Sequence, residues 1–355
     1  MIMRKIGDPE GGAEKSVRPH VGMGSRVRHQ VVPIGVKKAS TLAGVAPVIV
    51  SASRSTDIPA FYSGWFANRL REGHVRWVNP FNRQPRYVFF ANTRLMVFWS
   101  KNPLPLLQYL PEIDAKGINY YFQFTVNDYE RERIEPHVPP LAHRLETFRR
   151  LADLVGKKRV IWRFDPLILT DTLTVDVLID RIATLAGQLR NYTERLVISF
   201  ADIGVYAKVQ RNLARENIRC QEFTPDLMRE VARRLQPLSR ETGLTVATCA
   251  EGIGLTAYGI EHNRCVDDRL MIELFSKDQK LMEFLGYEPD LFSSPSRPYL
   301  KDKGQRKACG CIVSKDIGMY DTCPHMCAYC YANASCKLVE DNFKKHRTNE
   351  DALIP

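Results

Sequence analysis

Short apolar runs alternate with amphipathic stretches along most of the chain, a pattern that predicts strands followed by helices. Six of the runs have the length and the β-branched and aromatic content of strands. Nearly every position in them is apolar, so we expect both faces of the sheet to be covered, as in parallel sheets. The predicted strands are 47–53, 95–99, 120–125, 159–164, 196–200 and 244–248.

The stretches between these runs carry apolar residues at helical spacing; in 140–155 they include Leu141, Leu145 and Phe148. Another helix begins at Thr224-Pro-Asp226, which supplies an N-cap, a proline at the first position and an acid in the first turn. Residues 75–90 predict a hairpin, because two β-favouring runs flank an Asn-Pro-Phe-Asn turn. The remaining predicted helices are 61–71, 104–115, 174–189 and 206–217.

Strand followed by helix, repeated in this way, indicates an α/β fold, which we expect to be a (β/α) barrel or partial barrel with a parallel sheet. Each predicted strand ends in polar or charged residues, and in a parallel barrel these ends meet at the face that carries the chemistry. The alternative is that polar residues merely mark where buried strands stop. The residues are Ser53, Arg54, Asp57, Ser100, Lys101, Asn102, Gln123, Thr125, Asn127, Arg163, Asp165, Ser199, Asp202, Thr248, Cys249 and Glu251.

The net charge of +11 raises the question of nucleic acid as a partner. Residues 1–45 hold eight Lys and Arg against three Asp and Glu, a net charge of +5, and their aperiodic, glycine-rich sequence predicts a flexible tail. The remaining +6 supports nucleic acid only weakly. We expect a barrel body over 46–300, a cluster segment over 301–335 that completes the barrel, and a helical or frayed tail over 336–355.

Nine cysteines, clustered late in a chain of 355 residues, favour metal ligation in a reducing cytosol over a disulfide framework. The sequence has no apolar run near the ~20 residues of a membrane span and no secretory pattern at its start. We therefore expect a cytoplasmic protein that does not contact a membrane.

Three of the cysteines, Cys323, Cys327 and Cys330, are spaced CxxxCxxC ahead of a helix-like run. A [4Fe–4S] cluster held by three thiolates keeps one iron free for a small molecule, so the ligand count favours such a cluster. Zinc is the alternative. Because zinc prefers four ligands, it would have to recruit His325 or Cys336.

With Tyr329 directly before the last cysteine, this motif resembles that of the radical S-adenosylmethionine enzymes. The resemblance implies that S-adenosylmethionine binds the open iron and is cleaved to a 5′-deoxyadenosyl radical, with an electron from a donor such as flavodoxin or ferredoxin. In those enzymes the cysteine loop usually follows the first strand. Here, if a strand at 311–317 packs beside 48–53, the unit of strand, loop (318–330) and helix (331–345) is intact and the barrel is circularly permuted.

Most of the chain, from about 47 to 335, resembles the domain of unknown function 1848 family. That family is regarded as radical S-adenosylmethionine-like because of its cysteines, and the resemblance gives no substrate. A fainter likeness to spore photoproduct lyase, a DNA-repair enzyme, rests on CxxxCxYCY and on the stretch Arg163-Phe-Asp-Pro166. The segments that match the family begin at Ser53, Asn79, Phe98, Trp162, Cys249, Gly304 and Cys309.

Four further cysteines are the usual complement of a second, fully ligated [4Fe–4S] cluster, and we hypothesise that they form one. A four-thiolate zinc site and buried inert thiols are the alternatives. Cys220 is most simply a buried apolar residue, and Cys336 is interpreted as incidental. The four cysteines are Cys249, Cys265, Cys309 and Cys311.

S-adenosylmethionine presents a carboxylate that needs a cation, and ribose hydroxyls that need hydrogen-bond partners. A strand-end ion pair is the alternative for Arg163 and Asp165. Glu251 is expected to bind substrate or to organise the second cysteine group, and His262 is more simply a loop histidine. The candidate cations are Arg54, Lys101 and Arg163. The candidate ribose partners are Ser53, Asp57, Gln123 and Asp165.

Three functions compete at this point. The first is a radical enzyme acting on an unidentified substrate. The second is a radical enzyme that repairs or modifies nucleic acid. The third is a non-catalytic iron–sulfur or zinc protein whose metal sites are fully ligated.

Overall fold

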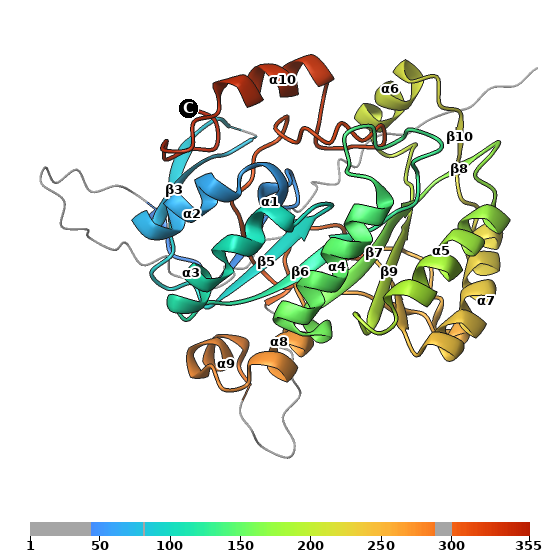
Figure 1. The fold of residues 1–355 in the computed structure, drawn as a ribbon, viewed down its shortest axis with the longest axis horizontal. Coiled ribbons are helices and arrows are strands. Elements are labelled where there is room, and N and C mark those ends of the chain that lie inside the picture. The colour runs from blue at the N-terminus through green and yellow to red at the C-terminus, as the bar shows by residue number, and fades with distance from the viewer. Residues whose placement is uncertain (1–43, 81, 288–299) are drawn as a thin grey trace, which may run out of the picture.

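A computed structural model describes residues 44–80, 82–287 and 300–355. Its centre is a sheet of eight parallel strands in the order β12-β11-β9-β7-β6-β5-β2-β13 (Figure 1). All six predicted strands belong to it, because their continuous apolar runs suit a sheet with both faces covered. The strands are β2 (Ile49–Ala52), β5 (Leu95–Ser100), β6 (Asn119–Thr125), β7 (Val160–Leu167), β9 (Arg195–Phe200), β11 (Thr245–Thr248), β12 (Glu261–His262) and β13 (Lys315–Asp316).

Helices connect the strands in the predicted alternation, and α7 begins as its sequence indicates. The hydroxyl of Thr224 accepts a hydrogen bond from the Leu227 N–H, which caps the helix. The helices are α1 (Ile58–Phe61), α2 (Ser63–Glu72), α3 (Leu110–Ala115), α4 (Leu141–Val155), α5 (Val175–Leu189), α6 (Ala207–Arg215), α7 (Pro225–Thr242), α8 (Asp268–Phe275), α9 (Gln279–Leu285) and α10 (Cys336–Lys345).

The two faces of the sheet bury different sets of side chains, because successive residues of a strand point to opposite sides. Phe122 and Phe124 of β6 pack in a core shared with α1, α2, α4, α5 and α7. Tyr121 of the same strand packs in a second core with residues of α8 and α9, such as Met271 and Leu281. Figure 1 shows α8 and α9 apart from the other helices, at one end of the sheet. Both faces are therefore covered, as predicted.

The two edge strands of the sheet, β12 and β13, approach each other through the segments that flank them. The N–H of Ile312, ahead of β13, donates to the carbonyl of Val266, after β12, at 3.1 Å. Within the described residues no strand pairing joins β12 to β13. The structure is thus an α/β fold with a large parallel sheet.

A smaller three-stranded sheet lies beside the first and contains the predicted hairpin. β3 (His74–Val78) pairs antiparallel with β4 (Pro85–Phe89), and β4 also pairs with β1 (Gly44–Val45). The last two residues of the predicted tail are thus a strand, whereas 1–43 lie outside the described residues. A further pair, β8 (Leu169–Thr170) and β10 (Cys220–Gln221), was not predicted.

Two predicted helices and one predicted strand are shorter than the sequence indicates. Residues 104–109 form a 3₁₀-helix before α3, because Pro111 has no N–H for an α-helical bond to the preceding turn. The helix expected over 331–345 begins at Cys336, where the hydroxyl of Ser335 caps the N–H of Leu338. The strand expected over 311–317 is reduced to β13.

Of the helices in the described ranges, none combines the length and the apolar character that a membrane crossing requires.

Candidate functional site

A loop of residues 317–335, here called the cysteine loop, follows β13 at the carboxyl edge of the sheet (Figure 1). β13 pairs in parallel with β2, with Asp316 opposite Ser51. This pairing confirms that a C-terminal strand packs beside the strand at 48–53. The cysteine loop therefore begins at the edge where β2 and β5 end.

Groups from several elements hold the cysteine loop through its carbonyl oxygens. The hydroxyl of Tyr62 donates to the carbonyl of Thr322 at 2.5 Å, and the Asn212 amide of α6 donates to that of Cys330 at 3.2 Å. The indole of Trp77 in β3 donates to a glycine carbonyl at the start of the loop. Because these contacts fix the backbone, the three thiols occupy defined positions.

The thiols of the cysteine loop are near enough to interact, and burial decreases from Cys327, which is buried, to Cys323 and Cys330, which are half-buried. Burial raises the pKa of Cys323 to about 12 and the pKa of Cys327 well above its ordinary value. Cys327 interacts electrostatically with both Cys323 and Cys330. A nearby cation is what would hold buried thiols as thiolates, and a bound metal supplies that charge.

His325 is not available as a further ligand in this arrangement. Its Nε2 lies 2.8 Å from Oδ2 of Asp57, and its Nδ1 lies 3.3 Å from the carbonyl of His137. In the described ranges, no group of three or more His, Cys, Asp or Glu side chains surrounds a point where a single metal ion would bind. The donor set of the loop is therefore three thiols, which matches a cluster better than a four-coordinate zinc ion.

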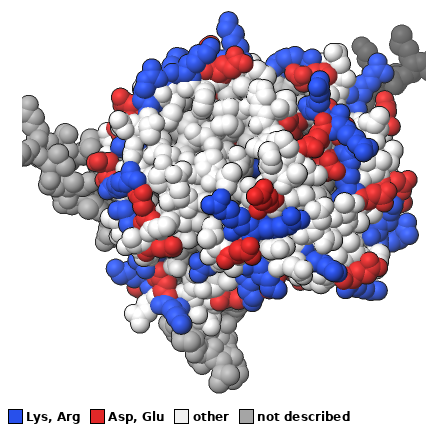
Figure 2. Space-filling view, in the orientation of Figure 1, with Lys and Arg blue, Asp and Glu red and all other residues white. Residues whose placement is uncertain are grey.

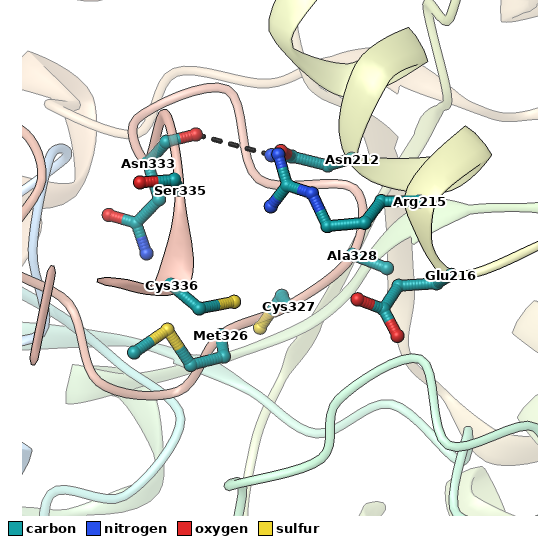
Figure 3. Close-up of a pocket in the computed structure, with 9 residues that line it drawn as sticks. All are labelled: Asn212, Arg215, Glu216, Met326, Cys327, Ala328, Asn333, Ser335 and Cys336. Carbon is teal, nitrogen blue, oxygen red and sulfur yellow. Dashed lines mark hydrogen bonds between the residues drawn. The ribbon is translucent and has the colours of Figure 1, made fainter. Parts of the chain in front are cut away.

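Cys336 is the one other cysteine beside this donor set. It is exposed at the start of α10 and lines a cavity of about 20 Å³ together with Cys327 (Figure 3). Arg215 and Glu216, at the end of α6, point into the same cavity. Cys336 is thus the remaining candidate for a fourth ligand if zinc binds here.

Asp57 joins three elements at this edge of the sheet. Its carboxylate accepts from the Ala60 N–H as the cap of α1, from the Ser100 hydroxyl at 2.7 Å and from the Lys101 N–H at 2.7 Å. His325 completes the set. Asp57 was predicted to bind a ribose, but its oxygens are taken up in orienting the cysteine loop against β2 and β5.

A buried carboxylate, Glu135, lies beneath the cysteine loop. It pairs with the ammonium of Lys101 at 2.8 Å and accepts from the Tyr329 hydroxyl and, at 2.9 Å, from the Asn127 amide. Although burial alone would raise it, the charges of Lys101 and Arg144 lower the pKa of Glu135 to about 2. Lys101 also lies 5.5 Å from the centre of the Tyr329 ring.

Arg163 and Gln123 lie on the other side of the sheet edge, away from the cysteine loop. The Arg163 guanidinium pairs with Asp165 and donates to the side-chain amide oxygen of Gln123 at 3.2 Å and to the sulfur of Cys265 at 2.9 Å. The hydroxyl of Ser199 also donates to Asp165. The predicted ion pair at the strand end is therefore present, and it faces the second group of cysteines.

The four cysteines of that second group come together although the sequence separates them. The sulfurs of Cys249 and Cys265 are 3.4 Å apart, and the Cys265 N–H donates to the sulfur of Cys311 at 3.2 Å. Cys309 contacts Cys311 through its side chain. The guanidinium of Arg54 lies near them too, over the ring of Trp99 at 4.9 Å, while the Arg54 carbonyl accepts from the hydroxyl of Tyr331 in the cysteine loop at 2.7 Å.

Glu135 and the orienting role of His325 were not found from the sequence. Glu135 lies in the irregular connection between β6 and α4, with no motif around it, and its partner Tyr329 is 194 positions away. The one signal was the aromatic residue before the last cysteine, which identifies Tyr329 but not the carboxylate that it contacts.

Two further residues singled out in the sequence lie apart from the cysteine loop in the chain. Cys220 is half-buried, and Glu251 accepts a hydrogen bond from the Phe200 N–H at 3.0 Å.

Fold and site together define an α/β protein whose eight-stranded parallel sheet carries a three-cysteine loop at its carboxyl edge. The chain belongs to the family described as "Domain of unknown function (DUF1848)", which matches residues 49–332. The match spans the sheet, the cysteine loop as far as Ala332 and the second cysteine group. No curated protein matches the chain.

Solved structures resemble the chain only remotely. Dihydropyrimidinase from Brevibacillus agri NCHU1002 is 10% identical over 70% of this chain and 52% of its own, with a TM-score of 0.27. D-hydantoinase from Bacillus sp. AR9 is 10% identical over 72% and 53%, with a TM-score of 0.25. The chain thus spans about half the length of both. A putative alpha-L-fucosidase from Bacteroides thetaiotaomicron VPI-5482 is 12% identical over 92% and 98%, with a TM-score of 0.26.

Proposed function

We propose that this protein is a radical S-adenosylmethionine enzyme that holds a [4Fe–4S] cluster through Cys323, Cys327 and Cys330. The observation that supports the proposal most is the donor set of the cysteine loop: three thiols, of which Cys327 is buried and the other two are half-buried, with both nitrogens of His325 already engaged. Three thiolates on a four-iron cluster keep one iron open. When bound, such a cluster holds S-adenosylmethionine and supplies the electron that cleaves it.

The architecture proposed for this activity is a partial (β/α) barrel in which the strand that precedes the cluster loop comes last in the sequence. The parallel pairing of β13 with β2 supports this arrangement. So does the hydrogen bond from Ile312 to Val266, which brings the two edges of the sheet together. The carboxyl ends of the strands then surround one site, as in other parallel barrels.

Within this site we assign Lys101 to the carboxylate of S-adenosylmethionine. Of the three candidate cations, Lys101 is the one that interacts with Cys327 and lies against Tyr329. Glu135 accepts from its ammonium and holds it in position, while further N–H groups of the ammonium remain for a ligand. Arg54 and Arg163 face the second cysteine group and are not assigned to this role.

The test is anaerobic reconstitution with iron and sulfide, followed by reduction with dithionite in the presence of S-adenosylmethionine. We expect 5′-deoxyadenosine to form, because the open iron admits the sulfonium compound. Cys327→Ala should abolish product, whereas Cys220→Ala, which alters a half-buried thiol far from the loop in sequence, should not. A reconstituted protein whose cluster is reduced by dithionite but that forms no 5′-deoxyadenosine would overturn the proposal.

Cys336→Ala separates a three-thiolate cluster from a four-ligand zinc site. If the cluster has an open iron, this variant keeps its iron, sulfide and 5′-deoxyadenosine yield. If the site is a structural zinc ion with Cys336 as the fourth ligand, the variant loses zinc, because structural zinc sites have four protein ligands. Metal analysis of matched preparations distinguishes the two outcomes.

Nucleic acid is not part of the proposal. On the face drawn in Figure 2, Lys and Arg alternate with Asp and Glu instead of forming one cationic stripe. A continuous basic surface is the usual footprint of phosphate-backbone binding.

A further inference from the structure

We propose that Cys249, Cys265, Cys309 and Cys311 form a second metal centre, in which four thiolates bind a thiophilic metal separately from the cysteine loop. Two metals share this ligand chemistry, a [4Fe–4S] cluster and a single Zn²⁺ ion. The proposal does not depend on the function assigned to the cysteine loop.

The fold itself assembles the four thiols. Cys249 directly follows β11, Cys265 follows β12, and Cys309 and Cys311 precede β13, so the group unites segments from both edges of the sheet. Contacts run from Cys249 to Cys265 at 3.4 Å, from Cys265 to Cys311 and from Cys311 to Cys309. Four cysteines from three segments thus make one continuous set of sulfurs.

Hydrogen-bond donors point at these sulfurs. Cys311 accepts from the N–H groups of Cys265 and Val266 at 3.2 and 3.4 Å. Cys265 accepts from Arg163 at 2.9 Å and from the Asn263 amide at 3.4 Å. Neutral thiols are weak acceptors, so two of them would not need two N–H donors each. Metal-bound thiolates are commonly held by such hydrogen bonds.

Two buried cations face the same group. Arg54 makes no ion pair with any described residue, and its Nη2 is buried without a hydrogen-bond partner. The charge of Arg54 interacts with Asp316 and then with Cys311 and Cys265, and that of Arg163 interacts with Asp165 and then with Cys265 and Cys249. A buried guanidinium is costly unless negative charge compensates it. Four thiolates on a centre of charge +2 carry a net charge of −2 and would add to the compensation that Asp316 and Asp165 give.

The group is also reachable from solvent. A hollow of about 540 Å³ is lined by Cys309 together with polar residues of the neighbouring loops. Among them are Glu251, His262 and Arg264. Metal can enter from this side. The sulfurs form a chain rather than surrounding one point, so binding requires rotation of thiol side chains, and the four thiol protons leave to solvent.

Contact distances inform the choice between the two metals. Thiolates bound to one zinc ion at about 2.3 Å lie roughly 3.8 Å apart, close to the separation of Cys249 and Cys265. A cluster places each thiolate on its own iron and spreads them further. Both a cluster and a zinc ion fit the four thiols, and the iron, sulfide and zinc contents of the purified protein distinguish them.

The decisive experiment uses the full chain with the cysteine loop disabled, as Cys323→Ala/Cys327→Ala/Cys330→Ala. Purified without oxygen and supplied with iron, sulfide and zinc, this variant should retain about four irons with four sulfides, or about one zinc. Circular dichroism verifies that it is folded. A folded variant that holds no metal overturns the second centre, and this result is independent of whether the cysteine loop supports 5′-deoxyadenosine formation.

Thiol alkylation followed by mass spectrometry locates the metal without further substitutions. In the loop-disabled variant, Cys249, Cys265, Cys309 and Cys311 should react much faster after a chelator removes the metal. Cys220 and Cys336 serve as internal controls, and their labelling should not change. Equal labelling of the four thiols with and without metal would overturn the assignment.

A matched pair of substitutions tests the role of Arg54. Arg54→Met should reduce metal occupancy, whereas Lys301→Met, which removes an exposed cation nearby, should not.

Discussion

Among single residues, Glu135 stands out because it is buried and yet ionised. Lys101, Arg144, Asn127 and Tyr329 all direct positive charge or hydrogen bonds at it. They hold its pKa at about 2, below the value of 4.5 for an ordinary Glu. The carboxylate therefore connects two strand ends, helix α4 and the cysteine loop.

Glu135→Gln should destabilise the protein by roughly 3 kcal/mol at neutral pH, because Lys101 and Arg144 lose a buried counter-charge. The wild-type contribution is complete above pH 4.5 and is lost as the pH falls towards 2, since the folded-state pKa lies below the unfolded one. Urea unfolding at pH 7 and at pH 3 measures both effects, and the difference between variant and wild type should shrink at pH 3.

Glu194→Gln provides the control for that measurement. Glu194 pairs with Lys157 at 3.1 Å, but both side chains are about half exposed. An exposed pair of this kind contributes roughly 0–1 kcal/mol. A Glu135 variant as stable as the Glu194 variant at pH 7 would show that the buried network does not hold the loop.

At the scale of elements, the close approach of the cysteine loop to β2 depends on Gly318. A Cβ at this position would lie 1.9 Å from Oγ of Ser53 and 2.7 Å from Oγ of Ser55. Both hydroxyls are buried, so they cannot turn away into solvent. The start of the loop fits against the end of β2 only if residue 318 has no side chain.

Gly318→Ala should therefore destabilise the protein by about 2 kcal/mol or more and reduce its metal content, because the loop must move off β2. Gly187→Ala is the opposite case: Gly187 is exposed in α5 with no atom within 4 Å of an added Cβ. That substitution should stabilise the protein by roughly 0.5–1 kcal/mol. Thermal unfolding and iron analysis of both variants test the pair of expectations, and an intact metal content in Gly318→Ala would contradict the first.

Elements that rest on local signals were predicted well, and those set by tertiary contacts were not. The six longer strands are buried apolar runs, and Thr224 caps α7 as its sequence indicates. The two-residue strand β12 exists because its neighbour β11 sets its register, and no local pattern marks it. β13 was expected within 311–317, but its pairing with β2 limits it to two residues. Helices α8 and α9 follow N-capping aspartates, Asp267 and Asp278, which were available as signals and were overlooked.

The same division applies to the candidate site. The spacing of Cys323, Cys327 and Cys330 marks the cysteine loop in the sequence, whereas the second group was hypothesised from the number of remaining cysteines. The sequence did not show which face of the sheet would hold the second cysteine group. Arg163 lies on the same face as Ile161 and Tyr121, and on that face it reaches Cys265. Residues 1–43 lie outside the described part of the chain, so the predicted flexible tail is untested there.

On the scale of the whole molecule, the last ten residues are part of the packed structure. Leu353 and Ile354 are buried, and the carboxylate of Asp351 accepts from Arg76 and Tyr87 of the β3–β4 hairpin at 2.8 and 3.0 Å. The indole of Trp65 donates to the carbonyl of Glu350 at 3.0 Å. The C-terminal segment therefore fastens the hairpin and α2 beside the cysteine loop.

Deletion of residues 347–355 should lower the free energy of unfolding by about 3–6 kcal/mol. The burial of Leu353 and Ile354 is lost, and the residues that they cover become exposed. Deleting Pro355 alone, which is exposed, should have little effect. Guanidinium unfolding of the two truncated proteins provides the comparison. A shortened chain as stable as the full one would show that the segment packs without contributing to stability.

The position of β13 determines when the two proposed metal centres could be loaded during synthesis. β2 is made early, but one of its edges stays without a neighbour until residues 315 and 316 leave the ribosome some 260 positions later. Six of the seven proposed ligands are made after residue 264, so a nascent chain has no complete site to load. If the two proposed centres exist, iron or zinc would have to be delivered to a nearly finished polypeptide, and a chain interrupted before residue 309 would bind neither.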